Sequence, residues 1–118
     1  MSLGMDSPHD AIVLDLLEQG VDDWVPARSL SYCLWQVSGD DLAATRALAV
    51  EVVGALLRED LMAVGELGEP GFVAWTGDPA DVLDRFISAM AAVNWEPDTT
   101  SWWFSLTEHG EEVARARL

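Results

Sequence analysis

Apolar residues in the first half of the chain recur every three or four positions, the spacing that gathers them on one side of an α-helix. The pattern predicts three helices, over residues 8–20, 26–37 and 41–59, and Gly20 is expected to end the first of them. The third helix should bury one row of side chains, formed by Leu42, Thr45, Ala49, Val52 and Leu56.

Side chains that can accept hydrogen bonds from the first N–H groups of a helix precede three of the predicted helices. Ser7 precedes the first helix, and Asp40 or Asp41 precedes the third. Asp78 precedes a fourth helix over residues 79–93, with Pro79 at its first position. The buried face of this fourth helix should consist of Val82, Phe86, Ile87, Met90 and Val93.

The segments on either side of the fourth helix predict strands. Residues 61–66 and 72–75 flank a turn rich in glycine and proline, and therefore predict a β-hairpin. Residues 102–106 predict a third strand, after which Thr107 can cap a last helix. Alternation along the third strand places Trp102 with Phe104 and Leu106 on a core-like face.

These elements predict an α+β fold, in which a helical bundle packs against a small antiparallel sheet of two to three strands. A length of 118 residues suits one domain and allows a core that needs neither disulfide nor metal. We therefore expect a single domain over residues 1–118, with residues 1–5 disordered or derived from a cloning vector.

The segment Phe104-Ser105-Leu106-Thr107-Glu108-His109-Gly110 resembles the "LT-x-x-G" phrase of winged helix-turn-helix regulators, including the multiple-antibiotic-resistance regulator type. With the preceding elements, the resemblance covers residues 8–76 and 102–117. It implies a winged-helix domain in which residues 61–75 form the wing and Thr107 caps the following helix. This chain differs from the family in carrying a whole helix, residues 79–93, between the hairpin and the phrase.

The charge of the chain is strongly acidic: 21 Asp and Glu residues oppose six basic residues, for a formal net charge of −15. Such a charge repels nucleic acid and anionic membranes and attracts basic partners. On the predicted recognition helix, only Arg46 and Arg58 could contact DNA, and five acidic residues surround them between Asp40 and Asp60. The acidic balance favours a protein partner over a nucleic acid.

All six bases are arginine and lysine is absent, which indicates a GC-rich bacterial genome. The single cysteine cannot form an internal disulfide, no secretory signal pattern is present, and no apolar run approaches the ~20 residues that span a bilayer. We expect a cytoplasmic protein that does not enter a membrane.

No nucleophile motif, phosphate loop, dinucleotide-binding turn or zinc motif is present, so we expect neither an enzyme, nor a cofactor, nor a metal site. His9 and His109 are isolated in the sequence, although His109 shares a helix face with Glu112. Cys33 lies in the middle of a helix among apolar residues, which favours a buried structural thiol over a reactive one.

The six tryptophans are many for a chain of this length. We expect Trp35 to lie in the core. Alternation turns Trp103 away from the core face, where it contributes either to an interface or to contacts with the fourth helix. Trp103 and Trp95 are therefore the candidate interface residues.

Together these features predict a non-catalytic, winged-helix-like module that acts through protein–protein contacts. Its partner would be a basic protein, with the module acting as a regulator or as an inhibitor or immunity-type binder, or a second copy of the chain. The alternative is a DNA-binding transcriptional regulator that uses Arg46 and Arg58, and a small enzyme ranks third.

Overall fold

The computed structural model of the protein describes residues 8–98 and 101–117. These residues form five helices and four strands and confirm the α+β class. The predicted cap Ser7 and residues 1–5 lie outside the described residues. The elements in chain order are α1 (Pro8–Asp22), β1 (Val25–Pro26), α2 (Ala27–Ser38), α3 (Leu42–Arg58), β2 (Met62–Gly68), β3 (Gly71–Ala74), α4 (Pro79–Ala92), β4 (Trp103–Leu106) and α5 (Glu108–Arg117).

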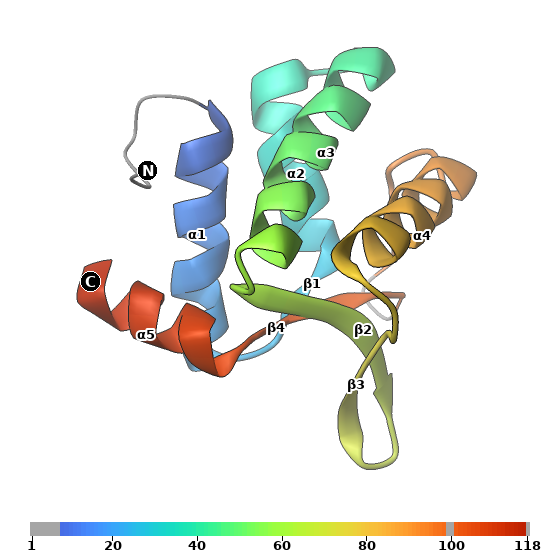
Figure 1. Cartoon of the computed structure of the whole chain (residues 1–118). Helices are drawn as coiled ribbons and strands as arrows, with labels where there is room; N and C mark the ends of the chain where they lie inside the picture. Colours follow the sequence, from blue (N-terminus) through green and yellow to red (C-terminus); the bar gives the residue numbers. More distant parts are fainter. Residues whose placement is uncertain (1–7, 99–100, 118) are drawn as a thin grey trace.

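The four strands form one antiparallel sheet in the order β1-β4-β2-β3, so the last strand of the chain lies between the first two (Figure 1). The prediction of two to three strands was wrong by one, because β1 was not expected: Val25 lay outside the predicted elements and Pro26 was expected to begin a helix. In β1, Val25 pairs with Phe104 and Pro26 with Trp103. A strand of two residues is too short to show the alternation that identifies strands in a sequence.

Helices α1, α2 and α3 lie together on one side of the sheet, with α4 beside α3 and α5 beside α1, while the β2–β3 hairpin projects away from them (Figure 1). The ring of Phe86 on α4 meets the ring of Phe104 on β4 edge-on, with their centroids 5.4 Å apart, and both side chains are completely buried. The helix that interrupts the family resemblance therefore contributes to the same core as the sheet.

The predicted starts of α3 and α4 are confirmed. The Asp41 side chain accepts a hydrogen bond from the Ala44 N–H, and the Asp78 side chain accepts one from the Asp81 N–H, both at 3.0 Å. The predicted end of α1 was wrong, because the helix continues past Gly20 to Asp22. A β-carbon on Gly20 would lie 2.8 Å from Cγ of Leu106, so this glycine allows α1 to approach β4 closely.

The predicted hairpin is confirmed, with β2 extending two residues further than expected, to Gly68. Gly71 has a φ of 111°, a conformation that favours glycine. A cluster of three side chains ties the hairpin to α4: Trp75 Nε1 donates to Glu66 at 3.0 Å, and Arg85 of α4 lies 4.0 Å above the Trp75 ring. Arg85 also pairs with Glu66 at 3.5 Å, so this carboxylate of β2 binds both Trp75 and α4.

Within the described ranges, none of the helices has both the length and the apolar character needed to cross a bilayer.

Candidate functional site

Three large apolar side chains are exposed where α2 meets the start of α3. Tyr32 and Trp35, three residues apart on α2, are 62% and 57% exposed, and Leu42 at the start of α3 is 54% exposed. Because residues three apart share a helix face, the two rings lie on the same side of α2. All three line a groove of about 700 Å³.

The expectation that Trp35 and Leu42 are buried was therefore wrong. In α2 the buried row is Ala27, Leu30, Cys33 and Leu34, a complete helical stripe that leaves Trp35 outside it. In α3 the predicted row is buried from Thr45 onwards, but Leu42 lies at the first residue of the helix, beyond the reach of the core.

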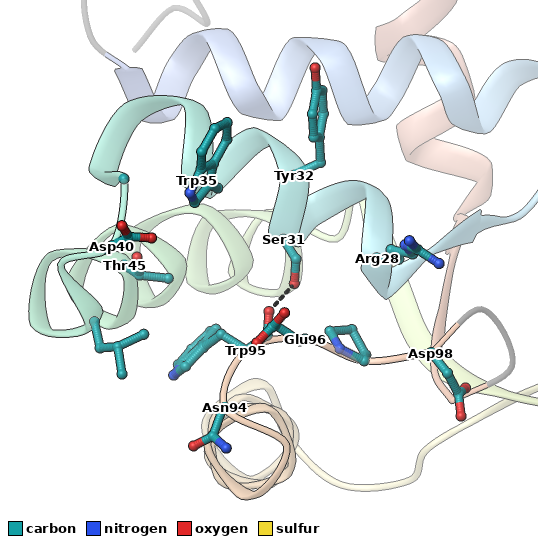
Figure 2. Close-up of a pocket in the computed structure, with 13 residues that line it drawn as sticks. Arg28, Ser31, Tyr32, Trp35, Asp40, Thr45, Asn94, Trp95, Glu96 and Asp98 are labelled. Atoms are coloured by element: carbon teal, nitrogen blue, oxygen red, sulfur yellow. Dashed lines mark hydrogen bonds between the residues drawn. The ribbon is translucent and has the colours of Figure 1, made fainter.

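The opposite wall of the groove is the segment that follows α4, residues 94–98 (Figure 2). Trp95 in this segment is only 8% exposed and belongs to the hydrophobic core. Its ring therefore offers little surface to a partner, which corrects the expectation that Trp95 is an interface residue. Its backbone instead positions the wall, because Ser31 Oγ of α2 donates a 2.9 Å hydrogen bond to the Trp95 carbonyl.

The backbone of this wall adopts an unusual conformation. Asn94 and Trp95 both have left-handed φ values, 56° and 63°. The Trp95 N–H donates to the Met90 carbonyl at 2.8 Å and the Asn94 N–H to the Ala91 carbonyl at 3.1 Å, the pair of bonds that closes a Schellman helix end. A left-handed tryptophan costs on the order of 1–2 kcal/mol. These bonds and the one from Ser31 hold it, so the groove is preformed.

The charged side chains along the groove are mainly acidic. Asp40, Glu96 and Asp98 line it together with a single basic residue, Arg28. In the view of Figure 2, Asp40 lies at the same end as Trp35, whereas Arg28 lies at the opposite end. Glu96 and Asp40 are exposed, so their charges face the solvent that a partner would displace.

A second hollow, of about 410 Å³, lies on the other side of Arg28 and Tyr32 and includes Cys33 and Asp15. Cys33 is 7% exposed, which confirms the predicted buried thiol, and its Sγ lies 3.3 Å from Oδ2 of Asp15. Burial, followed by the hydrogen bond to Asp15 and the charge of that carboxylate, raises the pKa of Cys33 to about 12. The thiol is therefore protonated at neutral pH and is a poor nucleophile.

Trp103, the other candidate interface residue, is half-buried on β4 and is not among the residues that line the groove. Phe104 is completely buried, and Trp102 and Leu106 pack against the core, as alternation predicted. The indole Nε1 of Trp103 is buried and has no hydrogen-bond partner among the described residues. The structure thus does not bring the two candidate tryptophans into one site.

The two candidate DNA-contacting arginines are exposed on α3 but do not converge. Arg46 and Arg58 are twelve positions apart, which corresponds to about 18 Å along a helix axis. The guanidinium of Arg58 folds back along its own helix, since a β-carbon on Gly54 would lie 2.6 Å from Nη1 of Arg58.

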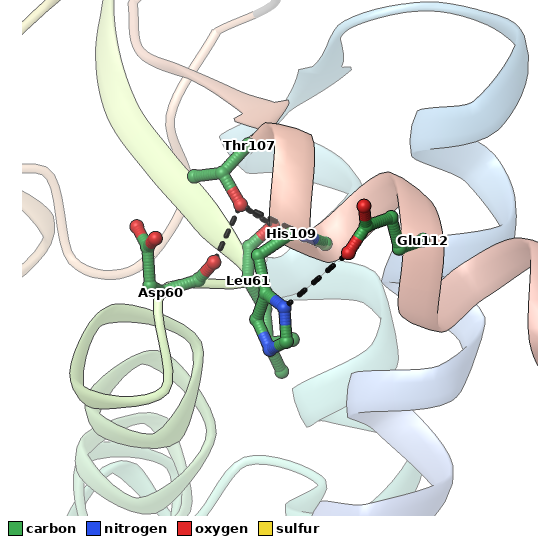
Figure 3. A network of polar contacts seen from close by, with 6 residues as sticks. Asp60, Leu61, Thr107, His109 and Glu112 are labelled. Atoms are coloured by element: carbon green, nitrogen blue, oxygen red, sulfur yellow. Dashed lines mark hydrogen bonds and ion pairs between the residues drawn. The ribbon is translucent and has the colours of Figure 1, made fainter.

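His109 and Glu112 share a face of α5, as predicted, with Nδ1 and Oε1 3.9 Å apart (Figure 3). Thr107 caps the same helix, because its Oγ1 accepts a 2.9 Å hydrogen bond from the Gly110 N–H. Within residues 8–98 and 101–117, no three His, Cys, Asp or Glu side chains gather in a way that could hold a metal ion.

No protein-family model matches the chain, and searches of curated proteins and of solved structures found no match. The resemblance to winged-helix regulators therefore stays a prediction.

The sequence-based prediction missed Tyr32, Trp35 and Leu42 as site residues, and within residues 94–98 it named only Trp95. One signal was available: Ala27, Leu30 and Leu34 already complete a buried stripe, which leaves Tyr32 and Trp35 as an aromatic pair outside it. No comparable signal marked the wall after α4, whose conformation depends on a hydrogen bond between residues 64 positions apart.

Proposed function

We propose that the protein is a non-catalytic, winged-helix-like module that acts through protein–protein contacts, as a regulator or as an inhibitor of its partner. The observation that carries the proposal is the exposure of Tyr32, Trp35 and Leu42 along one preformed groove. Exposed aromatic and aliphatic side chains that are contiguous and rimmed by polar residues are typical of interaction sites.

The order of the elements supports the winged-helix part of the proposal. Three helices precede the β2–β3 hairpin, β4 ends at Leu106, and the next residue, Thr107, caps α5 as the family resemblance implies. Because β4 pairs with both β1 and β2, the chain returns to the sheet after α4. This arrangement is compatible with a winged-helix domain into which one helix has been inserted.

The alternative function, a DNA-binding regulator, has less support. Phosphate contacts dominate DNA affinity and need several convergent basic side chains. The net charge is −15, and Arg46 and Arg58 lie far apart on α3.

The proposal also includes a cytoplasmic location. The chain has a single thiol, Cys33, and therefore cannot form an internal disulfide of the kind that an oxidising compartment would maintain.

The proposal is tested by affinity capture from a lysate of the source cell, with the wild-type chain, the Trp35→Ala/Leu42→Ala double variant and Val73→Ala as bait. Val73 is a matched control because it is exposed on β3, outside the groove. We expect the wild-type chain and the Val73→Ala variant to capture the same protein in a stoichiometric amount. The double variant should not capture it.

Two results would contradict the proposal. One is the absence of any captured protein that depends on the groove. The other is a shift of duplex DNA by the purified chain at sub-micromolar concentration, with a steep dependence on salt, which would favour the DNA-binding alternative.

A further inference from the structure

We infer that the groove between α2 and residues 94–98 binds a basic segment of a partner protein, in which a large apolar side chain is flanked by arginine or lysine. The inference rests on the proposed function and specifies the chemistry of its partner.

The size and lining of the groove suit a short segment rather than a single side chain. A volume of about 700 Å³ falls in the range of pockets that bury a drug-sized ligand, which is larger than one side chain. Trp35 and Leu42 provide exposed apolar surface for a large side chain of the segment, and Tyr32 adds a second exposed ring among the lining residues. Since Ser31 fixes the opposite wall through the Trp95 carbonyl, binding need not order that loop, which reduces its entropic cost.

The charges along the groove favour positive charge on the segment. The exposed carboxylates of Asp40 and Glu96 lie in the same groove as two exposed aromatic rings, Tyr32 and Trp35. A guanidinium or ammonium group can stack on an exposed aromatic face and at the same time pair with a carboxylate. Arg28 is the one lining residue that would repel such a group, and Figure 2 shows it at the end away from Asp40.

Charge also argues against a second copy of this chain as the occupant. Another copy carries the same net charge of −15 and would bring acidic residues to an acidic groove. Among its six arginines, Arg85 pairs with Glu66 and Arg115 with Glu111. A partner of opposite charge is attracted over the same distance at which a second copy is repelled.

The test is a selection of randomised peptides displayed on phage against the immobilised wild-type chain, with the Trp35→Ala/Leu42→Ala double variant used for counter-selection. We expect the enriched peptides to share arginine or lysine next to a large apolar residue. Synthetic copies of these peptides are then titrated against the protein. Trp35→Ala should weaken their binding about thirtyfold, as expected for an aromatic anchor.

A double variant that removes two negative charges from the groove tests the electrostatic part of the inference. Asp40→Asn/Glu96→Gln should weaken the basic peptides roughly three- to tenfold at low salt, and less at high salt. The matched control, Glu18→Gln/Asp84→Asn, removes the same charge from exposed residues outside the groove and should leave binding nearly unchanged. Circular dichroism of each variant establishes that the fold is retained.

Each outcome separates this inference from the proposed function. Enrichment of neutral or acidic peptides whose binding depends on Trp35 would overturn the inference of a basic partner. The proposed function, a groove that binds protein, would remain. If counter-selection with the double variant removes every peptide that binds the wild-type chain, docking in this groove would be overturned. A wild-type dimer in sedimentation that Trp35→Ala dissociates would identify the occupant as a second copy and also overturn the inference.

Discussion

Gly110 on α5 lies against the backbone of Leu61, so closely that a β-carbon on Gly110 would stand 1.8 Å from the Leu61 carbonyl oxygen. One turn earlier, Thr107 binds the same segment: its N–H donates to the Leu61 carbonyl at 3.1 Å, and its hydroxyl donates to the Asp60 carbonyl. Thr107 and Gly110, two of the three fixed positions of the "LT-x-x-G" phrase, thus share one physical role, which is to seat α5 on the turn between α3 and β2.

The Gly110→Ala variant should lose about 3 kcal/mol or more of unfolding free energy, because the new methyl group meets backbone that cannot rotate away. Urea unfolding followed by circular dichroism measures the loss. Gly68→Ala is the control: its β-carbon would meet no atom closer than 3.6 Å, and the change should stay within about 0.5 kcal/mol. Equal stability of the two variants would show that α5 does not approach the turn in this way.

The Thr107→Ala variant should lose about 1–2 kcal/mol, since it removes the oxygen that accepts from the Gly110 N–H. Thr107→Ser keeps this oxygen and should recover most of the loss. Thr76, which is exposed and outside the helices, provides the control Thr76→Ala. A serine variant as unstable as the alanine variant would mean that the methyl group, not the hydroxyl, stabilises this end of α5.

The sequence could predict most helices and the hairpin because their signals are local. Asp41 and Asp78 cap the helices that follow them, and Gly71 allows the turn. Gly20 shows where local reasoning fails. A glycine at the expected end of a helix looks like a stop signal, but here it lies within α1 because Leu106, 86 positions later, packs against it.

The groove could not be predicted because it depends on which faces remain uncovered. Helical spacing assigns residues to a side of a helix, but it does not say whether a neighbour covers that side. Trp35 was expected in the core because large apolar residues are usually buried, yet it remains 57% exposed on its side of α2. Trp95 was expected at a surface and is buried, because a left-handed backbone turns the chain back after α4.

Cys33 should react with thiol reagents about a thousandfold more slowly in the native than in the unfolded protein at the same pH. The rise of its pKa from 9.0 to about 12 reduces the thiolate fraction by that factor. Stopped labelling in buffer and in urea measures the ratio. Asp15→Asn should speed the native reaction only in part, because burial is the larger cause of the raised pKa. Rapid labelling of the native chain would contradict a buried thiol.

The same pKa predicts how stability depends on pH. Because the folded state holds the proton more tightly than the unfolded state, the contribution of Cys33 is complete below pH 9 and is lost as the pH rises towards 12. Cys33→Ala should cost about 1 kcal/mol at pH 7 and should remove this part of the alkaline decline. An unchanged alkaline profile in the variant would mean that the thiol ionises equally in both states.

Trp103 and Trp75 should respond in opposite ways to replacement by phenylalanine, because their indole Nε1–H groups have different surroundings. Trp103 buries an Nε1–H that has no partner among the described residues, whereas Trp75 donates its Nε1–H to Glu66 at 3.0 Å. An unsatisfied buried donor costs about 1–3 kcal/mol, so Trp103→Phe should leave stability unchanged or raise it, in spite of the smaller ring. Trp75→Phe should lose about 0.5–1.5 kcal/mol with its hydrogen bond.

Urea unfolding of both variants measures these changes in stability. A loss in Trp103→Phe as large as that in Trp75→Phe would show that the Trp103 indole has a partner, such as a buried water or a bound protein. Sedimentation of the same variant then shows whether that partner is a second copy of the chain.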